Sequence, residues 1–226
     1  MKIEKSGIHR NPFVGIYLRA SDSLAIVPKT LSPHVDEQLH RVLGVGQVVR
    51  LFINESPIIG VLCALNSKGC VIPHSSDAQE RSLLKKAGLN VCVISGPVSP
   101  GNAILANDRA ALVSPLFSKA DAKKIGDSLG VEVFQQSLAG LATVGASSVV
   151  TNRGFLAYNE TSETELKFLE KIFGVMGGIG TCNGGVPFGS LGIVANSRGA
   201  LIGESTTGYE VQRIYQALRG DSDVGR

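Results

Sequence analysis

Tryptophan is missing from this chain of 226 residues, and aromatic residues together make up only 5% of it. Proteins that bind single-stranded nucleic acid stack its bases on aromatic side chains, so such platforms are scarce here. Neither sign of charge dominates, with 22 Lys plus Arg against 19 Asp plus Glu and a net charge of +3. This small excess excludes a general nucleic-acid binder, because phosphate recognition usually needs a dense basic stripe.

Long hydrophobic runs are lacking as well. The longest apolar stretch, residues 57–65, is less than half of the roughly 20 residues that a membrane span needs. Residues 1–6 are charged and lack the apolar segment of a signal peptide, so none is expected. A hydrophobic content of 43% excludes wholesale disorder, and the length suffices for one large domain or two small ones.

Cysteine is scarce and unpaired. Cys63, Cys70, Cys92 and Cys182 include no CxxC pair, and each lies in or beside an apolar run. A zinc site would need close pairs of ligands, so the sequence predicts no metal. It predicts four reduced, buried thiols in a cytoplasmic protein.

Glycine is abundant, at 27 residues, and it marks the ends of five predicted helices. Each helix begins at a Ser or Thr and closes at a glycine suited to the left-handed conformation after a helix. The starts are residues 32, 76, 118, 162 and 207, and the closing glycines are residues 44, 88, 130, 174 and 220. Both series have a period of 42 to 46 residues, so two independent signals predict a fivefold repeat.

The segments between the helices repeat too. Before each helix lie an apolar run, a short polar turn and a second apolar run, as in residues 59–65, 66–69 and 70–73. This pattern predicts a hairpin, because Asn and Gly tolerate the positive φ of tight turns. A further strand is predicted after four of the helices, at residues 47–51, 89–94, 131–134 and 175–176. Only polar residues follow the fifth helix, so Lys2–Ser6 is predicted to supply that strand and close a ring.

One glycine-rich run, residues 177–180, follows the fourth predicted helix. It lacks the Lys-Ser/Thr ending of a phosphate-binding loop, and it follows a helix where such a loop would open one. The sequence therefore predicts a linker between the fourth and fifth units.

Several distinctive short motifs follow one another along the chain. They are Pro100-Gly101-Asn102, Asn107-Asp108, the segments 111–115 and 129–134, Thr143-Val144-Gly145, and the segments 149–154, 193–199 and 206–210. In this order and spacing the chain resembles the archaeal translation initiation factor 6 family, the ribosome anti-association factors. The resemblance covers essentially the whole chain, and the end soon after the fifth helix is similar to the archaeal form.

The resemblance implies an α/β fold, the pentein, a fivefold pseudosymmetric α-β propeller of five ββαβ-type units of about 44 residues. It implies a single domain over residues 1–220, with residues 1–7 closing the ring and 221–226 forming a flexible polar tail. The units are expected at roughly 8–52, 53–96, 97–139, 140–184 and 185–220.

The resemblance also implies a binding function. Such a translation factor binds the large ribosomal subunit on its subunit-joining face, sterically prevents association with the small subunit, and takes part in large-subunit maturation. The implied partners are a ribosomal protein and neighbouring rRNA, with no DNA and no membrane. A cytoplasmic monomer without cofactor, metal or catalytic residue is expected.

The resemblance places the ribosome contact on turns that lead into the first strand of several units. The candidates on these turns are Pro57, Ile59, Val61, Gly101, Asn102, Gly145, Asn183 and Gly185. Asn102 matches the asparagine of the Gly-Asn motif; its alternative role is a turn residue that bonds its own backbone. For Asn183 and Gly185 the alternative is a flexible connector. Eukaryotic relatives often carry Arg where Val61 stands, so a charged contact is lost or supplied elsewhere.

Two other functions remain open. The same fold hosts enzymes that modify amidino groups with a Cys thiolate, a His and acidic residues, and Cys182 is the only candidate nucleophile in a glycine-rich loop. All four histidines lie in the first third of the chain, although a ring could bring His74 close to that cysteine. The third alternative is an interaction scaffold with a partner other than the ribosome.

Overall fold

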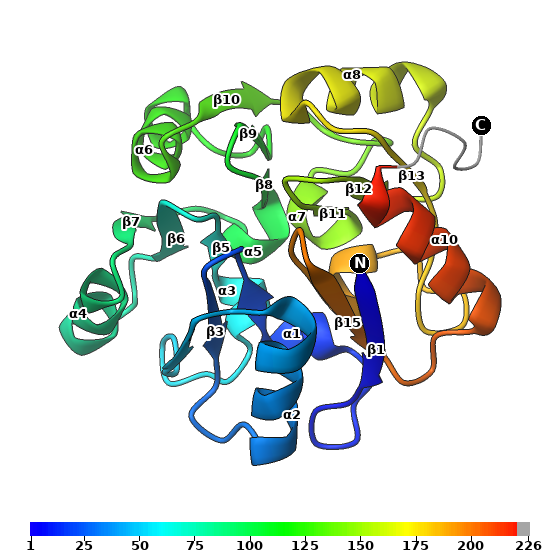
Figure 1. Cartoon of the computed structure of the whole chain (residues 1–226). Coiled ribbons are helices and arrows are strands. Elements are labelled where there is room, and N and C mark those ends of the chain that lie inside the picture. Colours follow the sequence, from blue (N-terminus) through cyan, green and yellow to red (C-terminus); the bar gives the residue numbers. More distant parts are fainter. Residues whose placement is uncertain (221–226) are drawn as a thin grey trace.

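The computed structural model describes residues 1–220, and the predicted polar tail, 221–226, lies outside them. Five three-stranded sheets surround a pseudo-fivefold axis (Figure 1). In each sheet the middle strand is antiparallel to the first strand and parallel to the third. In that order the strands are β2 (Arg19–Ala20), β3 (Leu24–Val27) and β4 (Gln47–Arg50); β5 (Ala64–Leu65), β6 (Gly69–Pro73) and β7 (Asn90–Ile94); β8 (Ile104–Ala106), β9 (Ala110–Val113) and β10 (Glu132–Gln135); β11 (Val149–Val150), β12 (Phe155–Ala157) and β13 (Gly177–Ile179); and β14 (Ile193–Ala195), β15 (Gly199–Gly203) and β1 (Lys2–Ser6). This is the α/β pentein architecture that the sequence predicted.

One longer helix per unit lies on the outside of the ring (Figure 1). These helices are α2 (Pro33–Gln38), which continues as the π-helical segment η1 (Leu39–Leu43), α4 (Ala78–Lys86), α6 (Lys119–Leu129), α8 (Glu163–Phe173) and α10 (Gly208–Arg219). Ser118, Ser162 and Thr207 each accept a hydrogen bond from the amide three residues on, as the sequence predicted. One predicted cap is wrong by a residue, because Asp77 and not Ser76 caps α4.

Five one-turn helices form an inner ring around the axis, and they correct the predicted strands. They are α1 (Val14–Tyr17), α3 (Ile59–Leu62), α5 (Pro100–Ala103), α7 (Val144–Ser147) and α9 (Gly189–Gly192). Each contacts the next, and α9 contacts α1, so the ring is closed. The apolar run 59–65, predicted as one strand, is therefore a helical turn followed by the two-residue strand β5. Periodicity alone does not separate a short strand from a helical turn of four residues.

The N-terminal strand of the chain belongs to the sheet of the last unit. β1 pairs in parallel with β15 over five residues, from Lys2 with Gly199 to Ser6 with Gly203. The first strand of the chain thus completes the sheet of the last unit, and Figure 1 shows it beside α10.

The glycine-rich run after α8 is not a linker, which corrects the prediction. Gly177–Ile179 forms β13 and pairs in parallel with β12. A Cβ on Gly177 would overlap the ring and carbonyl oxygen of Phe155, so glycine lets this strand approach a large neighbour.

The apolar core is divided among the interfaces between units. In one of its five clusters, Ile26 of the first sheet packs with Cys70 and Ile72 of the second. The four cysteines are buried free thiols, as the sequence predicted. Among residues 1–220, no helix has the length and apolar character that crossing a membrane requires. The apolar clusters lie between neighbouring sheets. The axis is lined by the short first strands of the sheets and by the one-turn helices.

Candidate functional site

The inner ring is held together by backbone contacts that only glycine permits. A Cβ on Gly15 would overlap the carbonyl oxygen of Ser190, and one on Gly60 would overlap that of Gly15. The same relation links Gly101 to Gly60 and Gly145 to Gly101. Four consecutive units therefore present a glycine to the preceding unit at the same place. This contact fixes the one-turn helices against one another and makes the ring rigid.

The residue after each of these positions lies at the same place on its helix. We call this set the ring face: Ile16, Val61, Asn102, Ala146 and Leu191. Ala146 is buried, whereas the other four are half-buried. None of the five lines the cavity inside the ring. The ring face is apolar at four of its five positions and amide at the fifth.

Asn102 differs from the other predicted asparagine. No hydrogen bond of its side chain is recorded within residues 1–220, which argues against the alternative that it bonds its own backbone. Asn183 is engaged, because its side-chain amide donates to the carbonyl oxygen of Pro12 at 3.0 Å and its Oδ1 accepts from the Thr206 hydroxyl. Asn102 thus has no recorded side-chain partner within residues 1–220, whereas Asn183 joins the fifth unit to the first.

The other predicted site residues divide by burial. Ile59, Gly101 and Gly145 are buried within the ring and hold the helices in place. Pro57 and Gly185 are exposed, and Val61 is half-buried on the ring face. The structure therefore brings Val61 and Asn102 together on one surface, with Pro57 close by in the chain before α3.

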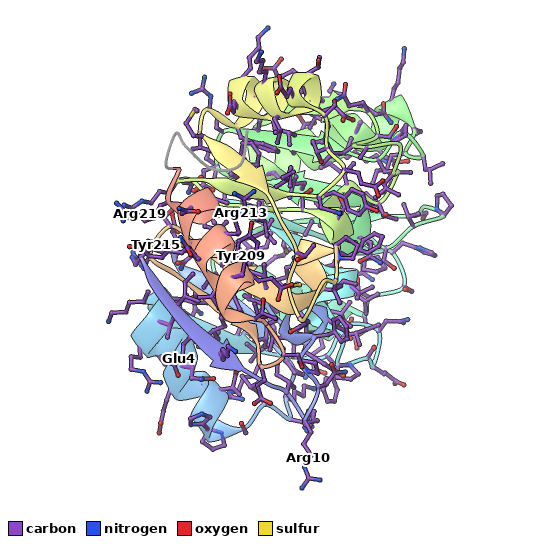
Figure 2. All side chains as sticks on the ribbon, turned by 90° about the vertical axis from the view of Figure 1, so that its right-hand side faces the viewer. Glu4, Arg10, Tyr209, Arg213, Tyr215 and Arg219 are labelled. Carbon is purple, nitrogen blue, oxygen red and sulfur yellow. The ribbon has the colours of Figure 1, made fainter. Side chains whose placement is uncertain are left out.

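Four tight turns precede the inner helices, and sequence analysis missed their geometry. Their central residues are His9-Arg10, Asn54-Glu55, Ala139-Gly140 and Asn183-Gly184, all with positive φ. Within residues 1–220, these turns hold every non-glycine residue of positive φ. Such a conformation costs of order 1–3 kcal/mol for a residue with a side chain, and it clusters at functional sites. Figure 2 shows Arg10 reaching away from the body of the protein on the first turn.

Two of these turns are held by carboxylates at the start of outer helices. The amide of Ala139 donates to Glu165 Oε1 at 2.7 Å, and the amides of Gly184 and Gly185 donate to Glu210 at 3.0 and 2.8 Å. Burial raises the pKa of Glu210, but hydrogen bonds from Thr207, Thr181 and the two glycine amides outweigh it and lower the pKa to about 2. The turn of Asn183 is therefore a fixed element, not a flexible connector.

Cys182 does not have the environment of a nucleophile. Its side chain is fully buried, and its sulfur lies 3.9 to 4.0 Å from the carbonyl oxygens of Phe188 and Gly189. Burial, followed by the charge of Glu210, raises the pKa of Cys182 to about 12, so the thiol is protonated at neutral pH. No histidine is among its recorded partners in the described chain. This geometry argues against thiolate attack on an amidino group.

Sequence analysis also missed Ile16 and Leu191, which belong to the ring face. The sequence did contain a signal for them. When the five units are aligned on Gly60 and Gly101, Ile16 and Leu191 fall at the positions of Val61 and Asn102. The first and last units carry less regular motifs, and Ser190 stands where the other units have glycine.

Comparison with known proteins finds relatives that match nearly the whole chain. Residues 3–217 match the family model described as the eIF-6 family. The chain is 38% identical over 225 residues to translation initiation factor 6 of Pyrococcus abyssi, covering 96% of this chain and 99% of that protein. It is 37% identical over 223 residues to translation initiation factor 6 of Saccharolobus islandicus, with the same coverage.

A solved structure, agmatine deiminase of C. jejuni, is similar over part of the chain. It matches with a TM-score of 0.41 and 14% identity, covering 55% of this chain and 49% of that one. The family assignment rests on the match over nearly the whole sequence: this chain belongs to the eIF-6 family.

Proposed function

We propose that this chain is a translation initiation factor that binds the large ribosomal subunit on its joining face and sterically prevents association with the small subunit. The observation that carries the proposal is the ring face, a rigid surface on inner helices of which four follow strained turns, in a member of the eIF-6 family. The bound ribosomal protein and neighbouring rRNA are part of the proposal, as is a role in large-subunit maturation.

Rigidity supports a blocking role. Steric exclusion needs a broad surface of fixed shape, and a standard interface covers about 800 Å² per partner. The glycine contacts of the inner ring and the hydrogen bonds of Glu165 and Glu210 fix the helices and turns before any partner arrives. Little conformational entropy is then lost on binding.

The composition of the ring face supports a protein as the main partner. Its four half-buried residues are Ile16, Val61, Asn102 and Leu191, and none of them is basic. The core of a protein interface is depleted in charged residues, whereas an rRNA contact draws on Lys and Arg. We assign an rRNA contact to Arg10, which lies on the turn before α1 and extends away from the body of the protein (Figure 2).

The proposal includes a non-enzymatic, monomeric protein acting in the cytoplasm as one domain over residues 1–220. The buried, protonated Cys182 supports the absence of amidino-group chemistry. The rigid fivefold ring supports the single domain.

The test is cosedimentation of the pure protein with separated archaeal ribosomal subunits on sucrose gradients. The expected result is that the protein travels with the large subunit alone and lowers the peak of joined ribosomes. Val61→Glu should abolish both effects, because a carboxylate would be desolvated at the centre of the interface. Lys167→Glu, on the exposed side of α8, is the control and should behave as the parent. A protein that stays at the top of the gradient would refute the proposal.

A further inference from the structure

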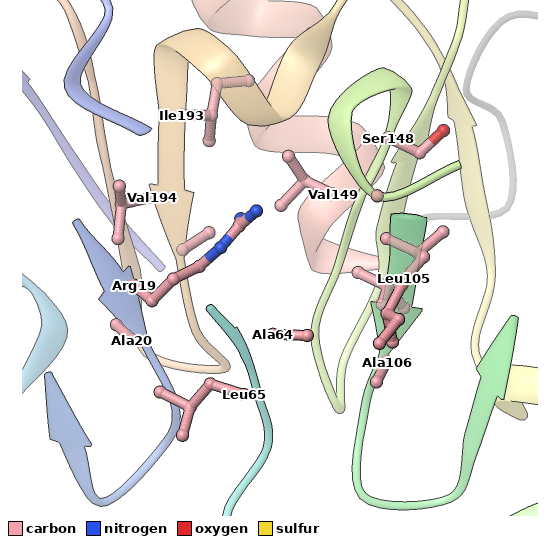
Figure 3. A pocket seen from close by; sticks show the side chains of 14 residues that line it. Arg19, Ala20, Ala64, Leu65, Leu105, Ala106, Ser148, Val149, Ile193 and Val194 are labelled. Carbon is pink, nitrogen blue, oxygen red and sulfur yellow. The ribbon is translucent and has the colours of Figure 1, made fainter. Parts of the chain in front are cut away.

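A cavity of about 60 Å³ lies inside the ring of first strands, and Arg19 on β2 extends into it (Figure 3). The equivalent positions of the other four units are Ala64, Leu105, Val149 and Val194, which also line this cavity. Four units thus contribute apolar side chains, and the first contributes a guanidinium. A water molecule needs roughly 10–15 Å³ of such volume, so the cavity holds several small molecules or one ion with its water.

The hydrogen bonds of Arg19 tie together three other units. Nε donates to the carbonyl oxygen of Cys63 at 3.0 Å, Nη1 to Ser190 Oγ at 2.7 Å and Nη2 to the carbonyl oxygen of Gly101 at 2.9 Å. All three acceptors are neutral. A guanidinium has five N–H groups, and these three bonds leave two of them available.

No carboxylate compensates this charge inside the cavity. The ion pairs recorded for residues 1–220 join Arg41 to Glu4, Arg50 to Asp36 and Lys124 to Asp121, away from Arg19. Asp22 and Asp108 line a separate cavity of about 30 Å³, which does not include Arg19. Their oxygens accept hydrogen bonds from Ser197, Ser67 and Asn152. A layer of apolar residues separates the two cavities: Ala20, Leu65, Ala106, Val150 and Ala195.

Arg19 is half-buried, and a cation withdrawn from water without a carboxylate partner is costly, because part of its solvation is lost. Burial lowers the pKa of Arg19 to about 10, which expresses the same cost, yet the group stays charged at neutral pH. An anion in the cavity would offset this cost in a medium where charges interact strongly.

We propose that the central cavity binds a small monovalent inorganic anion, with chloride as the natural occupant, held by the two remaining N–H groups of Arg19. A dianion with several oxygens is a poor fit, because the cavity is small and a single guanidinium is the only charged group in its lining. The bound anion stabilises the closed ring, since Arg19 connects the first unit to the second, third and fifth. None of the ring-face residues lines this cavity.

The direct test is bromide, which replaces chloride and scatters X-rays anomalously. Crystals of the full chain soaked in sodium bromide should show one anomalous peak in the cavity, within hydrogen-bonding distance of Arg19 Nη. In solution, sodium chloride should raise the melting temperature in a saturable way, by about 2–4 °C over sodium gluconate of equal ionic strength. A cavity that holds only water, with equal melting temperatures in the two salts, would overturn the proposal.

Variants assign the effect to Arg19. In Arg19→Met the bromide peak and the difference between the two salts should both disappear. Arg19→Lys keeps the positive charge and should keep a weaker response. Arg153→Met removes an exposed cation outside the cavity and should respond as the parent does. If Arg19→Met fails to fold, the presence or absence of the bromide peak in the parent decides the question.

Discussion

The carboxylate of Glu210 accepts a hydrogen bond of 2.8 Å from the backbone amide of Gly185, 25 residues earlier in the chain. The same side chain closes the capping box of α10 with Thr207. One buried carboxylate thus starts the last outer helix and holds the turn of Asn183 beside the inner ring. Glu165 repeats the arrangement in the fourth unit, where it caps α8 and binds the amide of Ala139.

Glu210→Gln should lower stability in a pH-dependent way. The folded pKa of about 2 lies below the ordinary value of 4.5, so the carboxylate contributes stability above pH 4.5 and loses it as the pH falls toward 2. At 1.36 kcal/mol per pKa unit, this contribution is about 3 kcal/mol at neutral pH. Urea unfolding should show the parent far more stable than the variant at pH 7, with the gap closing between pH 4.5 and 2.

The control for this experiment is Glu163→Gln, in the exposed first turn of α8. It removes a charge near a helix start without touching a turn, so its effect should stay within about 0.5 kcal/mol at each pH. A gap between parent and Glu210→Gln that stays constant with pH would contradict the assigned role of the carboxylate.

Asn102→Ala should weaken binding to the large subunit and leave the fold intact. The side chain has no recorded hydrogen bond within residues 1–220, so its loss should change the free energy of unfolding by no more than about 0.5 kcal/mol. Cosedimentation measures the binding and urea unfolding measures the stability. Asn183→Ala is the matched comparison, and it should lose stability because its amide bonds Pro12 and Thr206. Equal stability losses in the two variants would show Asn102 to be structural.

Gly60→Ala should be severely destabilising, by about 3 kcal/mol, because the new Cβ would overlap the carbonyl oxygen of Gly15 and crowd that of Leu18. Gly208→Ala is the control, since no atom lies within 4 Å of a Cβ at that first position of α10. This second change should be neutral or stabilising by up to about 1 kcal/mol. Similar unfolding midpoints for the two variants in urea would contradict the close packing of the inner ring.

The period and the helix ends could be predicted because they depend on local chemistry. Ser162 caps α8 through the amide of Glu165, and Gly174 closes it with a φ of 66°, both within one helix. The inner helices could not be predicted in this way. Ile59-Gly60-Val61-Leu62 is an apolar run by itself, and it becomes a helical turn through contact with Gly15 of another unit.

The hairpin turns were predicted correctly, but the explanation offered for them, that Asn and Gly tolerate positive φ, does not hold at residues 66–69. The turn at residues 66–69 has no positive φ. Asn66 Oδ1 accepts from the amides of Lys68 and Gly69, while its side-chain amide donates to Asn107 and Leu129 in the next unit. Gly69 is required because a Cβ there would overlap the carbonyl oxygen of Ser128. The Asn and Gly of this turn are therefore required for contacts with the next unit. These contacts can be identified only in the assembled ring.

The candidate site was predicted in part for a similar reason. Val61 and Asn102, which lie on the ring face, were predicted as site residues because their motifs are distinctive, whereas Ile16 belongs to the least regular unit and was not predicted. The strain at Arg10 had no signal in the sequence, because arginine does not favour positive φ, whereas His9 belongs to a residue type that is enriched there. Residue type alone does not distinguish a residue of the ring face from a buried residue beneath it, since Val61 and Ile59 are both apolar. Only their burial in the structure distinguishes them.

Deletion of residues 1–6 should open the ring and lower the melting temperature. The deletion removes β1, leaves an edge of β15 unpaired, and strips buried Gln38 of its partners Ser6 and Glu4, which lie at 2.6 Å. A loss of about 3 kcal/mol corresponds to a drop of about 10 °C in a chain of this size. Differential scanning calorimetry measures the change, and a synthetic peptide of residues 1–7 added in excess should restore part of it. A scrambled peptide is the control and should restore nothing, since the pairing of β1 with β15 depends on its order of side chains. A melting temperature within a degree or two of the parent would show that the ring closes without this strand.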